Sequence, residues 1–135
     1  MTEALSLITV TLYTLIFGLP GSHQYTLTPS CVVRGSPRDY AAAHPTRPAL
    51  IVDVAQSGLP LARGRKAAAY ARAGIADYWI LNLSDRVLEV HREPARPGPA
   101  RRNWGYAAIE ALGADATVTP LAAPAAAIRV ADLLP

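Results

Sequence analysis

The sequence predicts a single domain of the α/β (α+β) class, built on a mixed central sheet with one helix packed against it. Three consecutive stretches predict this fold: an apolar, β-branched run at 49–54, an Ala-, Arg- and Lys-rich run at 61–73, and an aromatic run at 77–82. A strand, a helix and a strand in this order form a unit whose two strands are usually neighbours, with the helix on one face of the sheet. At 135 residues, the chain has room for one such domain.

The middle run has the composition of a helix and a defined end. Alanine, arginine and lysine favour helix, and Gly74 stands where a left-handed C-terminal cap is expected. Lys66 precedes Tyr70 by four residues, so the two side chains share one side of the helix. We expect this side, together with Ala69 and Ala73, to face the sheet, and the arginines of the helix to face solvent.

The remaining elements follow from alternation and from prolines. Residues 87–92 alternate with period two after a turn at 84–86, and so form a hairpin with the strand at 77–82. Trp79 of that strand and Tyr70 are expected to pack between helix and sheet. Shorter strands are expected at 104–109, 117–119 and 128–130, and exposed, proline-rich loops with solvated arginines at 37–48 and 93–103.

The N-terminus is predicted to be an atypical segment, 1–26, before a domain at 27–135. Residues 5–19 are apolar, but threonines interrupt them and no Lys or Arg precedes them, as it would in a secretion signal. We therefore expect a strand or short helix that ends at the breaker 18–21, with no membrane association. A cytoplasmic location agrees with the single cysteine, Cys31, which is expected to be a buried structural thiol.

Charge and motifs narrow the classes of function. An excess of 13 Lys and Arg over 10 Asp and Glu gives a formal charge of +3 and a pI near 9.4, which suits an anionic partner without requiring one. The sequence contains no Gly-rich phosphate loop, no cysteine pair for zinc and no GxSxG nucleophile elbow. His23, His44 and His91 are dispersed, so we expect surface positions for them, with His91 on the outward side of its strand.

One carboxylate, Asp53, stands inside the apolar strand at 49–54, where an unpaired ionised side chain would be costly to desolvate. It could bind a metal ion, pair with Lys66 or Arg63 of the helix, or lie at the solvated end of the strand. Magnesium prefers carboxylate and carbonyl oxygens, and a nearby lysine can orient a water or offset phosphate charge. A structural ion pair explains the same residues without catalysis, and the residues alone leave these alternatives open.

Longer motifs resemble the Uma2 family of restriction endonucleases, within the PD-(D/E)XK nuclease-like superfamily. The resemblance rests on VVRGSPRDY at 32–40, LIVDVAQSGL at 50–59, RGRK at 63–66, YARAGI at 70–75, DYW at 77–79 and IRVADLL at 128–134. It spans about residues 27–135 and is most specific from Lys66 to Trp79. It implies a mixed α/β core, magnesium-dependent cleavage of DNA, and a catalytic lysine moved from the strand to the following helix. A homodimer is compatible with it.

Position by position, the sequence keeps the lysine of the family pattern and changes its acids. Asp53 replaces a Glu, Ser30 stands where an Asp follows a proline, and Ala62 stands where a further Asp is common. The resemblance implies Asp53 and the Val54 carbonyl as residual metal ligands, and Lys66 as the residue that orients water or the scissile phosphate. With Ser30 and Ala62 as degenerate positions, we expect a weakened magnesium site. The alternative is a non-catalytic binding or partner protein with the nuclease fold.

Overall fold

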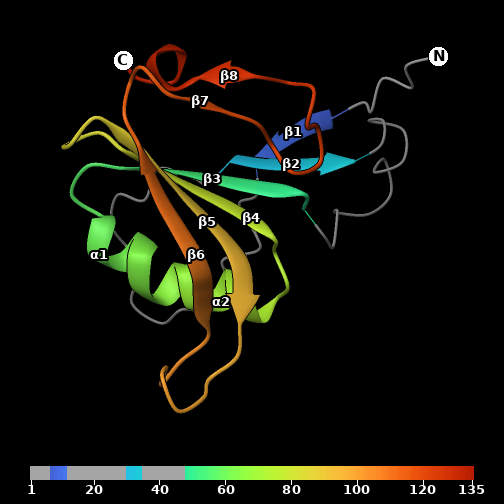
Figure 1. Ribbon diagram of the computed structural model, residues 1–135, viewed down its shortest axis with the longest axis vertical. Coiled ribbons are helices and arrows are strands. Elements are labelled where there is room, and N and C mark those ends of the chain that lie inside the picture. The colour runs from blue at the N-terminus through green and yellow to red at the C-terminus, as the bar shows by residue number, and fades with distance from the viewer. Residues whose placement is uncertain (1–6, 12–29, 35–47) are drawn as a thin grey trace.

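The computed structural model describes residues 7–11, 30–34 and 48–135 of the chain. Six strands form one sheet, in which the strands lie side by side in the order of the chain (Figure 1). These strands are β1 (Leu7–Thr11), β2 (Ser30–Arg34), β3 (Leu50–Ala55), β4 (Asp77–Asn82), β5 (Val87–Ala95) and β6 (Gly105–Leu112).

All neighbouring strands in this sheet are antiparallel except β3 and β4, which are parallel. A parallel pair needs a crossover connection, and a helical segment between the two strands provides it. The sheet is therefore mixed, with a strand, helix and strand unit at its centre. This confirms the predicted fold class, and the predicted strands at 49–54 and 77–82 are correct to within one residue.

The crossover is one continuous helical segment made of α1 (Leu59–Leu61), the π-helical turn η2 (Ala62–Lys66) and α2 (Ala67–Arg72). It begins two residues before the predicted start, because a proline in the first turn needs no hydrogen bond and suits a helix start. It is capped at Gly74 as predicted, where φ is +79°, a left-handed conformation that costs glycine little.

The buried face of the helical segment differs in part from the prediction. Tyr70 and Lys66 face the sheet as expected, but Ala69 and Ala73 are exposed. The buried positions are Ala62, Lys66, Ala67, Tyr70 and Ala71. Successive α-helical residues are about 100° apart, so the buried arc extends from Tyr70 toward residues 67 and 71, whereas residues 69 and 73 lie on its other side. The prediction extended the arc in the wrong direction.

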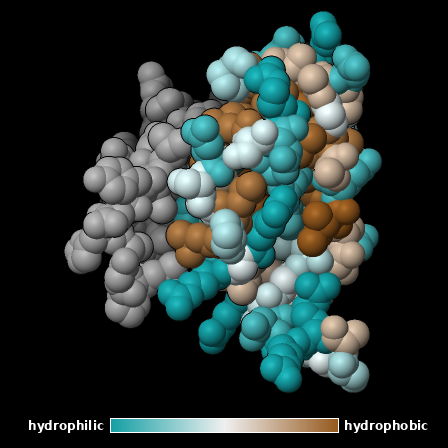
Figure 2. Space-filling model, turned by 90° about the vertical axis from the view of Figure 1, so that its left-hand side faces the viewer, coloured by the Kyte–Doolittle hydropathy of each residue, from teal (hydrophilic) through white to brown (hydrophobic). Residues whose placement is uncertain are grey.

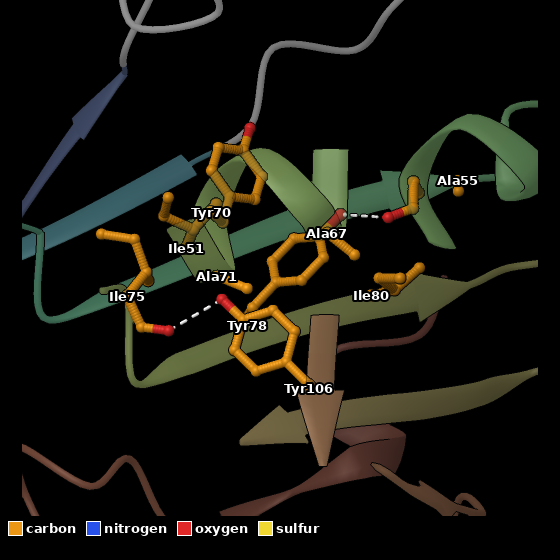
Figure 3. Packing of buried hydrophobic residues seen from close by; sticks show 10 residues of the cluster. Ile51, Ala55, Ala67, Tyr70, Ala71, Ile75, Tyr78, Ile80 and Tyr106 are labelled. Atoms are coloured by element: carbon orange, nitrogen blue, oxygen red, sulfur yellow. Dashed lines mark hydrogen bonds between the residues drawn. The ribbon is translucent and has the colours of Figure 1, made fainter. Parts of the chain in front are cut away.

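The core between the helical segment and the sheet is centred on three tyrosines (Figure 3). The rings of Tyr70 on α2 and Tyr78 on β4 lie edge to face, with centroids 4.9 Å apart. Tyr106 on β6 completes the group, and its hydroxyl donates a 2.7 Å hydrogen bond to the Ile75 carbonyl just after the helix. The tyrosines thereby hold the helix against the middle and one edge of the sheet.

The opposite face of the sheet carries a second apolar core, covered by β7 (Thr117–Val118), β8 (Ile128–Arg129) and the 3-10 turn η3 (Val130–Asp132) (Figure 1). The strands predicted at 117–119 and 128–130 are confirmed and form a two-stranded sheet of their own, whereas the strand predicted at 104–109 is β6 of the main sheet. Trp79 lies in this second core, so its predicted position between helix and sheet is wrong. Neighbouring residues of a strand point to opposite faces, and Tyr78 takes the helix side.

A buried carboxylate, that of Asp77, fastens this second layer to the sheet. Its Oδ1 accepts hydrogen bonds from Trp79 Nε1 at 2.7 Å and from Arg92 Nε at 2.9 Å. Its Oδ2 accepts one from the backbone N–H of Leu121 at 2.9 Å. Because protein donors satisfy both oxygens, the position is explained as a structural anchor.

The hairpin of β5 and β6 is longer than predicted. β5 continues through Pro94, which pairs with Tyr106 of β6, so the expected loop at 93–103 begins three residues later. Pairing of β5 with β4 ends at Arg92. Beyond that residue one side of β5 has no strand partner, and a proline without an N–H is tolerated there. Glu93, the first residue of β5 beyond the pairing with β4, has a φ of +61°.

The N-terminal expectations are only partly covered by the described residues. Of the strand or short helix expected within residues 5–19, the structure has a strand at Leu7–Thr11. The rest of that run, the loop at 37–47 and the side chain of Cys31 lie outside the description. Within the described ranges, no helix is both long enough and apolar enough to cross a membrane.

Candidate functional site

Two residues predicted from the sequence meet between β3 and the helical segment. Lys66 Nζ lies 2.9 Å from Asp53 Oδ2, and the side chains of the pair are only 5% and 3% exposed. Asp53 is buried inside β3, on the face that the helix covers, so it does not lie at a solvated strand end. Of the partners that the sequence left open, Lys66 is therefore the one that neutralises Asp53.

A tyrosine completes this pair. The hydroxyl of Tyr78, on the adjacent strand β4, lies 3.2 Å from Asp53 Oδ2 and 3.1 Å from the Ala62 carbonyl of η2. Burial, and next the negative charge of Asp53, raise the pKa of Tyr78 far above its ordinary value, so the hydroxyl stays a donor. The buried charges are thus compensated by each other and by a protein hydrogen bond.

A second charged pair lies on the same face of the sheet, across Ile80. In the strand register, Ile80 is opposite Asp53 on one side and opposite Glu89 of β5 on the other. The Arg63 guanidinium makes a bidentate hydrogen bond to the Glu89 carboxylate, in which Nη2 donates to Oε2 at 2.6 Å and Nε donates to Oε1 at 3.0 Å. Asn82 Nδ2 donates to Glu89 Oε2 at 3.3 Å. Burial alone would raise the pKa of Glu89, but these donors and the Arg63 charge bring it below its ordinary value.

His91 lies beside Glu89, and its predicted outward position is wrong. The side chain is 3% exposed, with its ring 5.5 Å from that of Tyr78 and 5.9 Å from that of Tyr106, between centroids. His91 pairs with Tyr78 across the sheet, which places it on the helix face. Burial lowers its pKa, an effect that Glu89 opposes. Its Nε2 is 3.5 Å from Glu89 Oε1 and has no hydrogen-bond partner among the described residues.

Comparison with protein-family models matches residues 8–131 to Uma2, described as a putative restriction endonuclease. The chain belongs to the Uma2 family. This confirms the family that the sequence motifs indicated, and it supports a nuclease-like function. The match begins inside the segment 1–26, and the predicted division at residue 26 stays a prediction. A comparison with curated proteins found no match.

Ala62 and Ser30, the two positions predicted to have lost an acid of the Uma2 pattern, belong to elements next to the ion pair. Ala62 is buried on η2, and its carbonyl shares the Tyr78 hydroxyl with Asp53. Ser30 begins β2 and pairs with Val52, the residue before Asp53. The structure describes the backbone of β2 and not its side chains, so the role predicted for Ser30 stays a prediction.

The described residues do not make up the magnesium site expected for a Uma2 nuclease. Magnesium takes an octahedral set of oxygens, commonly including one or two carboxylates. Asp53 supplies one carboxylate, and its Oδ2 already faces Lys66 and Tyr78. The Ala55 carbonyl points toward β4, because it accepts a hydrogen bond from Leu83 N. Successive carbonyls of a strand point in opposite directions, so the carbonyl of Val54 points away from β4. In the described part of the chain, no three His, Cys, Asp or Glu side chains come together as a metal-binding group.

Sequence reasoning missed five side chains of this region: Arg63 as the partner of Glu89, and Tyr78, Asn82, Glu89 and His91 as members of the polar cluster. Glu89 and His91 are two residues apart in one strand and so point to the same face of the sheet, which is the sequence signal that could have grouped them. It could not be interpreted, because strand alternation identifies a buried face only where the other face is solvated. Here both faces of β5 are covered.

Proposed function

We propose that this Uma2 chain is a DNA endonuclease of the PD-(D/E)XK type, magnesium-dependent by descent, with a degenerate metal site and weak cleavage. The observation that carries the proposal is the buried pair of Asp53 and Lys66. They lie in the strand and the helix where the motif resemblance leads us to expect a carboxylate and a lysine. Asp53 is the metal ligand that remains, and Lys66 is the cation that would face a phosphate or its attacking water.

The weakness follows from the number and engagement of the carboxylates. Cleavage of a phosphodiester with a divalent cation needs ligands that offset the cost of dehydrating that cation. Ser30 and Ala62 provide no carboxylate, and Asp53 is one methylene shorter than the Glu of the pattern. The Lys66 ammonium is engaged by Asp53 at 2.9 Å. Both groups would have to separate before either could act on a substrate.

The same observation supports one alternative, a non-catalytic binding or partner protein that keeps the nuclease fold. A buried ion pair that is fully compensated within the protein is a structural element in its own right. In this alternative, Asp53 and Lys66 fix the helix on the sheet, and DNA or another partner is bound without cleavage.

The test is nicking of supercoiled plasmid DNA in magnesium. Wild type should nick slowly or not at all, and the variant Ser30→Asp with Asp53→Glu should nick in a magnesium-dependent way. Adding Lys66→Met should abolish that gain while circular dichroism shows the variant folded. A matched control, Ala126→Asp with Asp115→Glu, adds the same charge at exposed positions and should leave nicking at the wild-type level.

The outcomes separate the proposals. Efficient magnesium-dependent nicking by wild type would contradict the degenerate site. If the restored variant binds DNA but never nicks it, the non-catalytic alternative is supported instead.

A further inference from the structure

A hollow of about 780 Å³ opens between the helical segment and the hairpin of β5 and β6. Asp53 and Lys66 do not line it, whereas Arg63 and His91, at the edge of the polar cluster described above, do. The β5–β6 connection forms the end of the molecule at the bottom of Figure 1, and Figure 2 shows mainly hydrophilic side chains there. Four arginines line the hollow: Arg63 and Arg65 from η2, and Arg101 and Arg102 from the β5–β6 connection.

The positive charge of this hollow is largely unbalanced. Arg63 alone of the four arginines has a carboxylate partner among the described residues, namely Glu89. Even there, Arg63 uses Nε and Nη2 for Glu89, and its side chain is 49% exposed. Several guanidinium groups around one concavity repel each other and raise the local concentration of anions.

Arg101 is held in position rather than left free in the loop. A tight turn closes between Gly98 and Arg101, whose backbones exchange hydrogen bonds of 2.8 and 3.0 Å. Arg101 Nη2 donates to the Tyr106 carbonyl at 3.2 Å. Its Nη1 lies against the backbone of Gly105, in the space that a Cβ would occupy. A cation ordered in this way loses little conformational freedom when it binds a ligand.

The lining of the hollow includes a buried polar atom that is only weakly engaged by the described residues. His91 lines the hollow and is 3% exposed, and its Nε2 faces Glu89 Oε1 at the long distance of 3.5 Å. A buried polar atom that lacks a good hydrogen bond is costly, and a bound water, ion or ligand is one way in which native proteins satisfy it. In the helix wall beside it, Gly64, Ala67 and Ala68 leave room for an occupant.

We propose that this hollow binds backbone phosphates of a nucleic acid strand. The planar fork of an arginine matches a phosphate in a bidentate way. Arg101 and Arg102 supply this fork from the hairpin and Arg65 supplies it from the helix, while His91 Nε2 offers a further hydrogen bond. The identity of the strand as DNA rests on the proposed function; the phosphate chemistry rests on the hollow alone.

The first test measures binding of a short fluorescein-labelled DNA duplex to the whole chain by fluorescence anisotropy, in EDTA and over a salt series. The variant Arg101→Gln with Arg102→Gln should bind roughly a hundredfold more weakly, because each of the two lost hydrogen bonds to a charged group is worth roughly tenfold. Each lost phosphate contact lowers the slope of log affinity against log salt by about 0.9, so the slope should fall by about 1.8.

A matched control removes the same charge elsewhere. Arg72→Gln with Arg129→Gln changes two exposed arginines that do not line the hollow, and should change affinity far less. If the two double variants lose affinity equally, binding follows net charge and the proposal is wrong. A further variant, Gly105→Ala, keeps the charge but displaces the Arg101 guanidinium, and should weaken binding as Arg101→Gln does.

Two additional readouts identify the ligand. Phosphate binding should shift the nuclear magnetic resonance signal of the His91 ring in wild type and not in the Arg101 and Arg102 variant; an unmoved His91 ring overturns the site. Inorganic phosphate should displace the labelled duplex only at a concentration far higher than that of the duplex. Displacement at a comparable concentration would indicate a site for the free anion and would overturn the proposal. Because binding is measured in EDTA, the outcome is independent of cleavage. If the chain binds as described and the variant Ser30→Asp with Asp53→Glu never nicks DNA, the proposed cleavage is contradicted and this inference stays intact.

Discussion

Removing the Lys66 ammonium should destabilise the fold more than removing any exposed charge on the same helix. Lys66→Met keeps an apolar stem of similar length, but leaves the Asp53 carboxylate, which is 2% exposed, with the Tyr78 hydroxyl as its described donor. Breaking a buried ion pair from one side costs about 3–5 kcal/mol, against a total stability of about 5–15 kcal/mol for a typical domain. We expect a loss near the lower end of this range, because Tyr78 still donates.

The assay is urea unfolding at pH 7 followed by tryptophan fluorescence, since Trp79 is 2% exposed in the second core. Arg65→Met is the matched control, because Arg65 is the exposed neighbour of Lys66. It should change the free energy of unfolding by no more than about 0.5 kcal/mol. Adding Asp53→Leu to Lys66→Met removes both charges and should restore much of the loss. The reasoning fails if Lys66→Met costs no more than the control, or if the double variant is less stable than Lys66→Met.

Two further predictions concern the rest of the fold. The pKa of Glu89 is lower in the folded chain than in the unfolded one, so the ionised carboxylate contributes to stability above about pH 4.5. This contribution disappears as the pH falls through the lower pKa of the folded chain. Glu89→Gln should therefore be less stable than wild type at pH 7 and lose less stability on acidification, as measured by thermal unfolding. Gly74→Ala should lower the free energy of unfolding by about 1 kcal/mol, because φ is +79° there, and urea midpoints compared with wild type would reveal it.

Much of the fold could be predicted from local patterns, because its central unit is local in sequence. Asp53 and Lys66 are thirteen residues apart and belong to a strand and the helix that directly follows it. A strand and its crossover helix pack on each other in almost any sheet of this kind. Lys66 and Arg63 of this helix could therefore be named as the candidate partners of Asp53 from the sequence, and the structure decides for Lys66.

The pairing of Arg63 with Glu89 could not be predicted in the same way. These residues are 26 positions apart, and they meet only because β5 turns back beside β4 in one particular register. A slip of one residue would send Glu89 to the other face. The errors for His91 and Trp79 have the same physical cause, since both faces of β4 and β5 are covered and alternation does not tell one face from the other.

The π-helical turn η2 has a consequence for how the chain can vary. It includes both Arg63 and Lys66, and a π turn accommodates one residue more than an α turn. Deleting Gly64 would convert it to ordinary helix and rotate one of these two cations by about 100° relative to the other. One carboxylate of the sheet would then lose its counter-charge. A single-residue deletion here should therefore be tolerated by the chain only together with replacement of Asp53 or Glu89.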